Sequence, residues 1–68
     1  MYRIVFSDPY RNHEATYIAE TVEGAAQQAD ELTGIGERTI LDDLEVQTLP
    51  WEYVDEETGV ETTIEEEA

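Results

Sequence analysis

The sequence contains no cysteine and no lysine, and its only basic side chains besides one histidine are three arginines. Without cysteine, neither a disulfide framework nor a thiolate metal site can stabilise the fold. No apolar run approaches the length of a membrane span, and the N-terminus lacks the pattern of a signal peptide. We therefore expect one soluble cytoplasmic domain, whose 68 residues lie near the lower size limit for folding without such links.

The dominant feature of the sequence is its negative charge. Eighteen Asp and Glu give a net charge of −15, and twelve of these acids fall within residues 37–68. A chain of this length folds to a sphere about 28 Å across, so the net charge amounts to about one per 1.9 Å, against about one per 1.7 Å of axis in duplex DNA. This charge strongly disfavours direct binding to nucleic acid or to an anionic membrane and favours a basic protein partner.

The first half of the chain predicts a hairpin followed by a helix. Residues 1–6 and 14–20 are rich in β-formers and predict two strands, joined by a turn cluster at 7–13. Residues 22–33 predict a helix, because apolar residues recur there at helical spacing. The apolar stripe comprises Val22, Ala25, Ala26, Ala29 and Leu32.

Both ends of this helix carry capping signals. Thr21 is a favourable N-cap residue, and Gly34 suits the left-handed position that follows a helix. The stripe is narrow because it consists mainly of alanine, which favours close packing of the helix on a sheet.

The beginning of the second half of the chain predicts a further strand. Within residues 37–49, Leu44, Val46 and Thr48 alternate with polar residues, as the inward positions of a strand do. Pro50 cannot donate a ladder hydrogen bond, so we expect this strand to end or bend there.

The C-terminal part predicts a final hairpin. A four-residue loop at 56–59, with Gly59 supplying a positive φ, is the register that keeps the aromatic side chains away from the acids. That register places on one face Trp51, Tyr53, Val60, Thr62 and Ile64, and on the other Glu52, Val54, Glu61, Thr63 and Glu65. The expected fold class is α+β, a small and mainly antiparallel sheet with one helix on a face, in the order ββαβ(ββ). We expect a single domain over residues 1–64 and a frayed acidic tail at 65–68.

No residue pattern indicates catalysis, a cofactor or a dedicated metal site. His13 has no second nitrogen or thiol ligand near it in the sequence, which favours an exposed loop histidine over a metal ligand or general base. The segment Gly34–Ile35–Gly36 follows a helix instead of preceding one, which is typical of a helix end and not of a phosphate loop. The acidic runs 42–45 and 55–57 lack the ligand spacing of an EF-hand. We therefore expect a non-enzymatic protein without cofactors.

The acidic surface is the remaining functional candidate. On a strand, residues two apart face the same way at a spacing of about 6.6 Å. Asp43 and Glu45 form one predicted row of carboxylates, and Glu61 and Glu65, with Glu52 across from them, form another. Such rows suit the lysines and arginines of a protein that grips a phosphate backbone. The predicted partner-binding residues are Asp42, Asp43, Glu45, Glu52, Asp55, Glu56, Glu57, Glu61 and Glu65.

Two other interpretations of the acidity stay open. A lysine-free composition rich in Thr and Glu also fits a protein from a salt-loving organism, in which the charge is an adaptation to the solvent. An antitoxin-like protein that covers some other basic partner would carry the same charge.

A cysteine-free acidic α+β domain of this size resembles the phage-encoded DNA-mimic inhibitors, above all the small acidic anti-CRISPR proteins. The likeness extends over the whole chain in size and charge, with acids concentrated in the DDLE, DEE and EEE clusters of residues 37–68. It is a likeness of composition, so no residue role is carried over by motif. The resemblance implies a monomeric inhibitor in the cytoplasm of a bacterial host that covers the DNA-binding surface of a CRISPR effector. A Cascade-like type I surveillance complex is the favoured partner.

Overall fold

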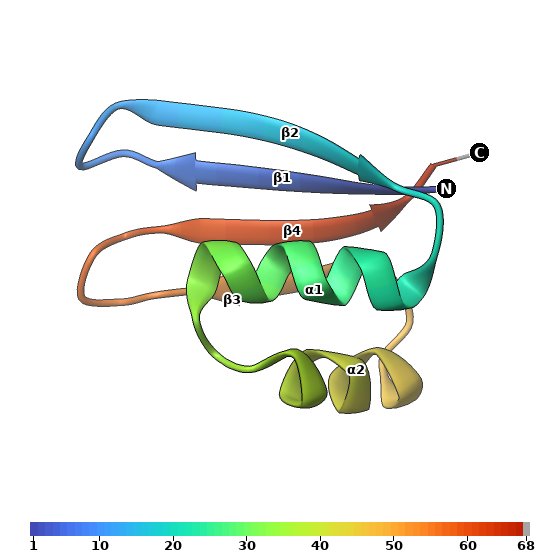
Figure 1. Cartoon of the computed structure of the whole chain (residues 1–68). Coiled ribbons are helices and arrows are strands. Elements are labelled where there is room, and N and C mark those ends of the chain that lie inside the picture. Colours follow the sequence, from blue (N-terminus) through green and yellow to red (C-terminus); the bar gives the residue numbers. More distant parts are fainter. Residues whose placement is uncertain (68) are drawn as a thin grey trace.

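The computed structural model of the chain describes residues 1–67, which form one four-stranded antiparallel sheet and two helices (Figure 1). In chain order the elements are β1 (Tyr2–Asp8), β2 (His13–Ala19), α1 (Val22–Thr33), α2 (Glu37–Val46), β3 (Trp51–Val54) and β4 (Glu61–Glu66). The strands lie side by side in the order β2-β1-β4-β3. The α+β class predicted from the sequence is confirmed.

The predicted N-terminal hairpin is present, but Ser7, Asp8 and His13, which were assigned to its turn, belong to the strands. Tyr2 pairs with Ala19 at its open end, and Asp8 pairs with His13 beside the turn. Within the turn Asn12 adopts a positive φ of 52°, which asparagine tolerates better than most residues. The hairpin therefore brings residues of the first twenty positions into one continuous half of the sheet.

The first helix occupies the predicted residues and is capped as expected. The Thr21 hydroxyl accepts a hydrogen bond from the Gly24 amide at 3.0 Å, and Gly34 closes the helix with a φ of 73°. The fully buried residues of α1 are Ala25, Ala26 and Ala29. Because these side chains are short, the helix backbone can lie close to the sheet.

The strand predicted through Leu44, Val46 and Thr48 is wrong, because residues 37–46 form the helix α2 instead. Ile40 is fully buried and Leu44 is partly buried, so these residues, four apart, share the inward face of a helix. Val46 is 82% exposed, which is incompatible with the inward strand position predicted for it. The element order is therefore ββααββ with two helices, not ββαβ(ββ) with one.

The C-terminal hairpin has the predicted register. Trp51 pairs with Ile64 and Tyr53 with Thr62, so the aromatic side chains share a face with Ile64 and not with the acids. The loop is closed by a hydrogen bond from the Asp55 amide to the Val60 carbonyl at 2.9 Å, and Gly59 has the expected positive φ of 76°. The alternation of apolar and acidic residues is thus sufficient to fix this part of the sheet.

The last strand extends beyond the boundary predicted for the domain. Glu65 and Glu66 belong to β4 and pair with Arg3 and Tyr2, and the Glu67 amide donates a hydrogen bond to the Met1 carbonyl at 2.9 Å. Two of the four residues assigned to a frayed tail are therefore strand residues. Ala68, also assigned to that tail, lies outside the described residues.

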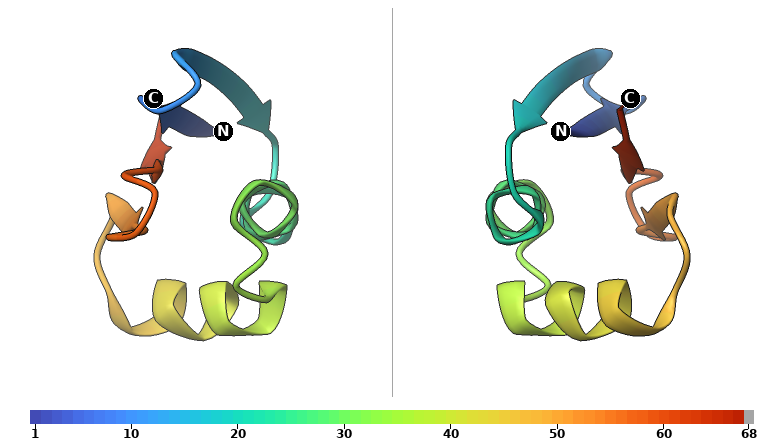
Figure 2. Two further views of the ribbon diagram at one scale, coloured as in Figure 1. Left: turned by 90° about the vertical axis from the view of Figure 1, so that its left-hand side faces the viewer. Right: turned by 90° about the vertical axis from the view of Figure 1, so that its right-hand side faces the viewer.

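The sheet curves from β2 over to β3, and both helices lie on its concave side (Figure 2). The buried core between these layers comprises Ile4, Ala25, Ala26, Ala29, Ile40, Trp51 and Ile64. The Trp51 indole N–H donates a hydrogen bond to the Asp43 carboxylate at 3.5 Å, which joins β3 to α2. No helix within residues 1–67 is long and apolar enough to cross a membrane.

Candidate protein-binding surface

The convex side of the sheet presents one open face, here called the outer sheet face. In residues 1–67 both helices lie on the other side of the sheet, so this face is covered by neither of them (Figure 2). Its side chains belong to the alternate residues of each strand that point away from the core. These residues are Arg3, Val5, Ser7, Glu14, Thr16, Ile18, Glu52, Val54, Glu61, Thr63 and Glu65.

Four carboxylates of the outer sheet face lie at fixed strand positions. Glu52 pairs with Thr63, so Glu61 and Glu65 are its diagonal neighbours on β4, about 7–8 Å away between Cα atoms. The row predicted from the sequence for these three acids is therefore present. Glu14 reaches the same face from β2, where it and Glu61 both pair with Ser7, two strand spacings or about 9.5 Å apart.

One arginine lies among these acids and is paired. The Arg3 guanidinium donates hydrogen bonds from Nε and Nη2 to the Glu65 carboxylate, with the Nε contact at 3.2 Å. This hydrogen bond and the negative charge of Glu65 raise the pKa of Arg3 above its usual value. Arg3 therefore stays charged and neutralises Glu65. The carboxylates of Glu14, Glu52 and Glu61 are left to face the solvent.

Two exposed apolar side chains share this face with the acids. Ile18 on β2 is 54% exposed and Val54 on β3 is 52% exposed. They lie on the two edge strands of the sheet, which also carry Glu14 and Glu52. A partner lying flat on this face would therefore meet apolar and acidic side chains next to one another.

The loop between β3 and β4 carries three further predicted acids, at the end of the sheet beside the first hairpin turn (Figure 1). One Asp55 carboxylate oxygen accepts a hydrogen bond from the Glu57 amide at 2.9 Å, which makes this side chain part of the turn. Glu56 and Glu57 are exposed. A Cβ added at Gly59 would lie 3.4 Å from a ring carbon of Pro9, so the two loops are in close contact.

The three predicted acids of α2 lie on the other side of the molecule. Asp42 and Glu45 are exposed, whereas Asp43 is half-buried and accepts the hydrogen bond of Trp51. Because residues two apart on a helix point in different directions, the predicted row of Asp43 and Glu45 is wrong. The structure thus divides the predicted acids between the sheet with its loop and the helix α2.

The structure also places the other residues considered from the sequence. His13 is exposed at the start of β2, and its ring lies 6.0 Å from that of Phe6. Gly34 and Gly36 connect the two helices, and the Gly36 amide donates a hydrogen bond to the Asp30 carboxylate at 2.9 Å. Among residues 1–67, no group of three His, Cys, Asp or Glu side chains lies close enough together to hold a metal ion.

The overall charge density agrees with the value expected from chain length. The radius of gyration is 11.2 Å and the longest dimension is 29 Å. Fifteen net charges over that length give about one per 1.9 Å, close to the linear density of duplex DNA.

Sequence reasoning missed two charged members of the outer sheet face, Glu14 and Arg3. The signal for Glu14 was present, because Thr16 and Ile18 follow it at the spacing of one strand face. The pairing of Arg3 with Glu65 depends on β1 and β4 being neighbours, which local patterns do not reveal.

Comparison with protein-family models, with curated proteins and with solved structures finds no match to the chain. The charged surface is therefore the basis for assigning a function.

Proposed function

We propose that this chain is a non-enzymatic inhibitor that imitates the charge of DNA and covers the nucleic-acid-binding surface of a basic protein. The outer sheet face and the β3–β4 loop form the binding surface in this proposal. The acids of α2 contribute to the overall field but do not contact the same partner surface, since they lie beyond the core.

The observation that carries the proposal is the open sheet face with its fixed carboxylates. Glu14, Glu52 and Glu61 sit on three different strands, and the one arginine on this face is occupied by Glu65. A rigid sheet holds these charges at nearly constant separations, whereas a flexible acidic tail would lose conformational entropy on binding.

The physical basis of binding is competition for the same cations that hold DNA. Lysine and arginine side chains that receive a phosphate backbone can pair with carboxylates of similar density, and the pairing releases bound counterions. Affinity should therefore fall as salt concentration rises. Ile18 and Val54 supply exposed apolar contacts that acidic residues alone lack.

We propose a CRISPR effector as the partner, with the type I surveillance complex tested first. The support for this choice is the resemblance in size, fold class and charge to the small acidic anti-CRISPR proteins. In such a complex the acids would meet the lysines and arginines that receive target DNA.

The test is displacement of labelled duplex target DNA from a purified type I surveillance complex. We expect the wild-type chain to displace the DNA and the triple variant Glu14→Lys, Glu52→Lys, Glu61→Lys to lose at least 100-fold in potency, about 2.7 kcal/mol. These side chains are exposed, so circular dichroism should show that the variant remains folded.

The matched control changes the charge equally at another place. Glu20, Glu31 and Asp42 are exposed and none belongs to the outer sheet face, so their reversal to lysine should cost less than tenfold. Equal losses in both variants would show that only net charge matters and would remove the sheet face from the proposal. No displacement by the wild-type chain at low salt would exclude this effector as the partner.

A further inference from the structure

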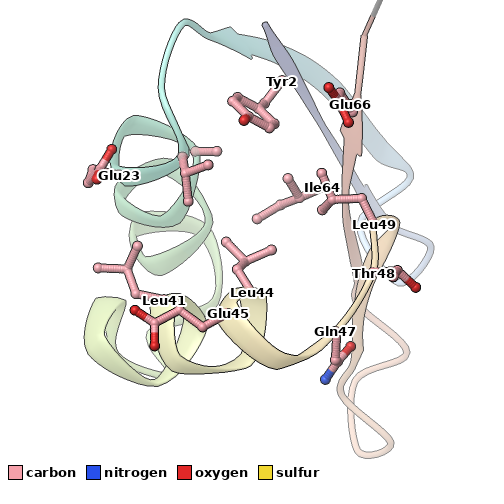
Figure 3. Close-up of a pocket in the computed structure, with 12 residues that line it drawn as sticks. Tyr2, Glu23, Leu41, Leu44, Glu45, Gln47, Thr48, Leu49, Ile64 and Glu66 are labelled. Atoms are coloured by element: carbon pink, nitrogen blue, oxygen red, sulfur yellow. The ribbon is translucent and has the colours of Figure 1, made fainter.

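A cavity of about 700 Å³ lies on the concave side of the sheet, away from the outer sheet face (Figure 3). It is bounded by the first turn of α1, by α2, by the segment 47–49, and by the ends of β1 and β4 near the chain termini. Its size falls within the range of about 300–1,000 Å³ that is typical of ligand sites.

One part of the cavity lining is apolar. Leu44 and the fully buried Ile64 point toward it from α2 and β4, and the ring of Tyr2 faces them from β1 (Figure 3). The remaining apolar wall consists of Val22, Ala25, Leu41 and Leu49. Leu41, Leu44 and Leu49 are only partly buried although they pack against the core, so apolar surface is left open for another group to cover.

The mouth of the cavity is acidic. Glu23, Glu45 and Glu66 are exposed lining residues that come from three separate elements. Glu23 and Glu66 lie at opposite sides of the space (Figure 3). In the described part of the chain none of the three arginines lines the cavity, so these carboxylates have no basic side chain beside them there.

We propose that this cavity is a second docking site, which takes a basic amphipathic helical segment of a protein partner. The segment would place leucine-like side chains against Leu41, Leu44 and Leu49 and its lysines or arginines against the three carboxylates. The proposal rests on the proposed function for one point, that the partner is a basic protein.

Charge and shape together favour this occupant. The three carboxylates come from separate elements around the cavity, so several cations spaced along one peptide segment can pair with them. A small amine would reach only one or two of them. A helix with an apolar stripe flanked by basic residues presents both kinds of group along one side. An acidic or neutral apolar segment would leave the three carboxylates desolvated without partners.

The test uses fluorescence anisotropy with a labelled 14-residue peptide of leucine and lysine arranged at helical spacing, in 0.15 M salt. A second peptide has serine in place of every leucine and the same net charge. We expect the leucine peptide to bind the wild-type chain at least tenfold more tightly than the serine peptide. We also expect it to shift the methyl NMR signals of Leu41, Leu44 and Leu49.

Two triple variants with equal charge change locate the binding. Glu23→Gln, Glu45→Gln, Glu66→Gln should weaken binding of the leucine peptide about tenfold, since each exposed ion pair contributes a modest amount. Glu20→Gln, Glu31→Gln, Asp42→Asn, at exposed positions outside both the cavity and the outer sheet face, should weaken it less than threefold. Equal binding of both peptides, or equal losses in both variants, would overturn the proposal, because the peptide would then only follow the net charge.

This test can fail independently of the proposed function. DNA displacement depends on the outer sheet face, and peptide binding depends on the carboxylates at the cavity mouth. If the mouth variant displaces DNA normally and binds the peptide normally, the docking site is excluded while the inhibitor proposal stands.

Discussion

At the scale of single residues, one buried hydroxyl stands out. Thr62 is fully buried on β4, and its Oγ1 has no hydrogen-bond partner among the residues that the structure describes. An unsatisfied buried polar group costs about 1–3 kcal/mol. We therefore predict that Thr62→Val raises the free energy of unfolding by about 1 kcal/mol, measured by urea denaturation with Trp51 fluorescence.

The neighbouring residue provides a control for this substitution. Thr63 has the same side chain on the same strand but lies on the outer sheet face, where it is half-exposed. Thr63→Val should therefore change stability by less than about 0.5 kcal/mol. A Thr62→Val variant that is no more stable than the wild type would show that the hydroxyl is satisfied in solution.

The acids are also not equivalent as single residues. Several are engaged within the chain, in a turn, an ion pair or the contact between α2 and β3. These are Asp8, Asp30, Asp43, Asp55 and Glu65. Only the contact of Glu65 with Arg3 joins distant segments, whereas the other four join residues two to eight positions apart. Residue type and charge alone did not separate these acids from those free to meet a partner.

At the scale of elements, sequence patterns succeeded where two signals agreed. The C-terminal hairpin could be predicted with its register, because the alternation around Trp51 and the position of Gly59 both select one loop length. The helix at 22–33 was marked by caps as well as by its stripe.

The second helix had only one signal, and that signal was ambiguous. Leu44, Val46 and Thr48 fit a strand, while Ile40 and Leu44 fit a helix over the same residues. Gly36 precedes α2 without a side-chain cap, so no N-terminal signal favoured the helix. In the folded chain these residues form a helix that packs against α1. A local sequence pattern does not reveal this contact between the two helices. The error carried over to the candidate site, because it placed Asp43 on the wrong surface.

The packing of α1 on the sheet leads to a prediction for the alanine stripe. Ala26 is fully buried in the core, so a larger side chain there would have to displace its neighbours. We predict that Ala26→Leu lowers the free energy of unfolding by about 1–3 kcal/mol, as overpacking of a core does. Gln27 is exposed on the same helix, so Gln27→Leu should change it by less than about 0.5 kcal/mol. Equal effects of both variants in urea denaturation would contradict close packing at Ala26.

At the scale of the whole molecule, the spacing of neighbouring acids matters more than the total net charge. An accessible surface of 4759 Å² shared by 15 net charges gives about 320 Å² each, a mean spacing of about 18 Å. Charges this far apart are largely screened at 0.1 M salt, where the Debye length is about 10 Å. Neighbouring acids on the outer sheet face, about 7–8 Å apart, still repel one another under these conditions. Local clusters therefore dominate both the cost in stability and the attraction for a basic partner.

This clustering predicts how the fold responds to salt. Between 0.01 M and 1 M NaCl the Debye length falls from about 30 Å to about 3 Å, so repulsion within the clusters is removed and the melting temperature should rise by several degrees. The chain should nevertheless be folded at 0.1 M salt, because its buried core does not depend on ions. The variant Glu14→Lys, Glu52→Lys, Glu61→Lys has a net charge of −9, since each reversal adds two charges to −15, and its melting temperature should rise less. Thermal melts followed by circular dichroism measure both. A chain that folds only near molar salt would instead identify the acidity as an adaptation to a saline solvent, and the charge would no longer support a DNA-mimic function.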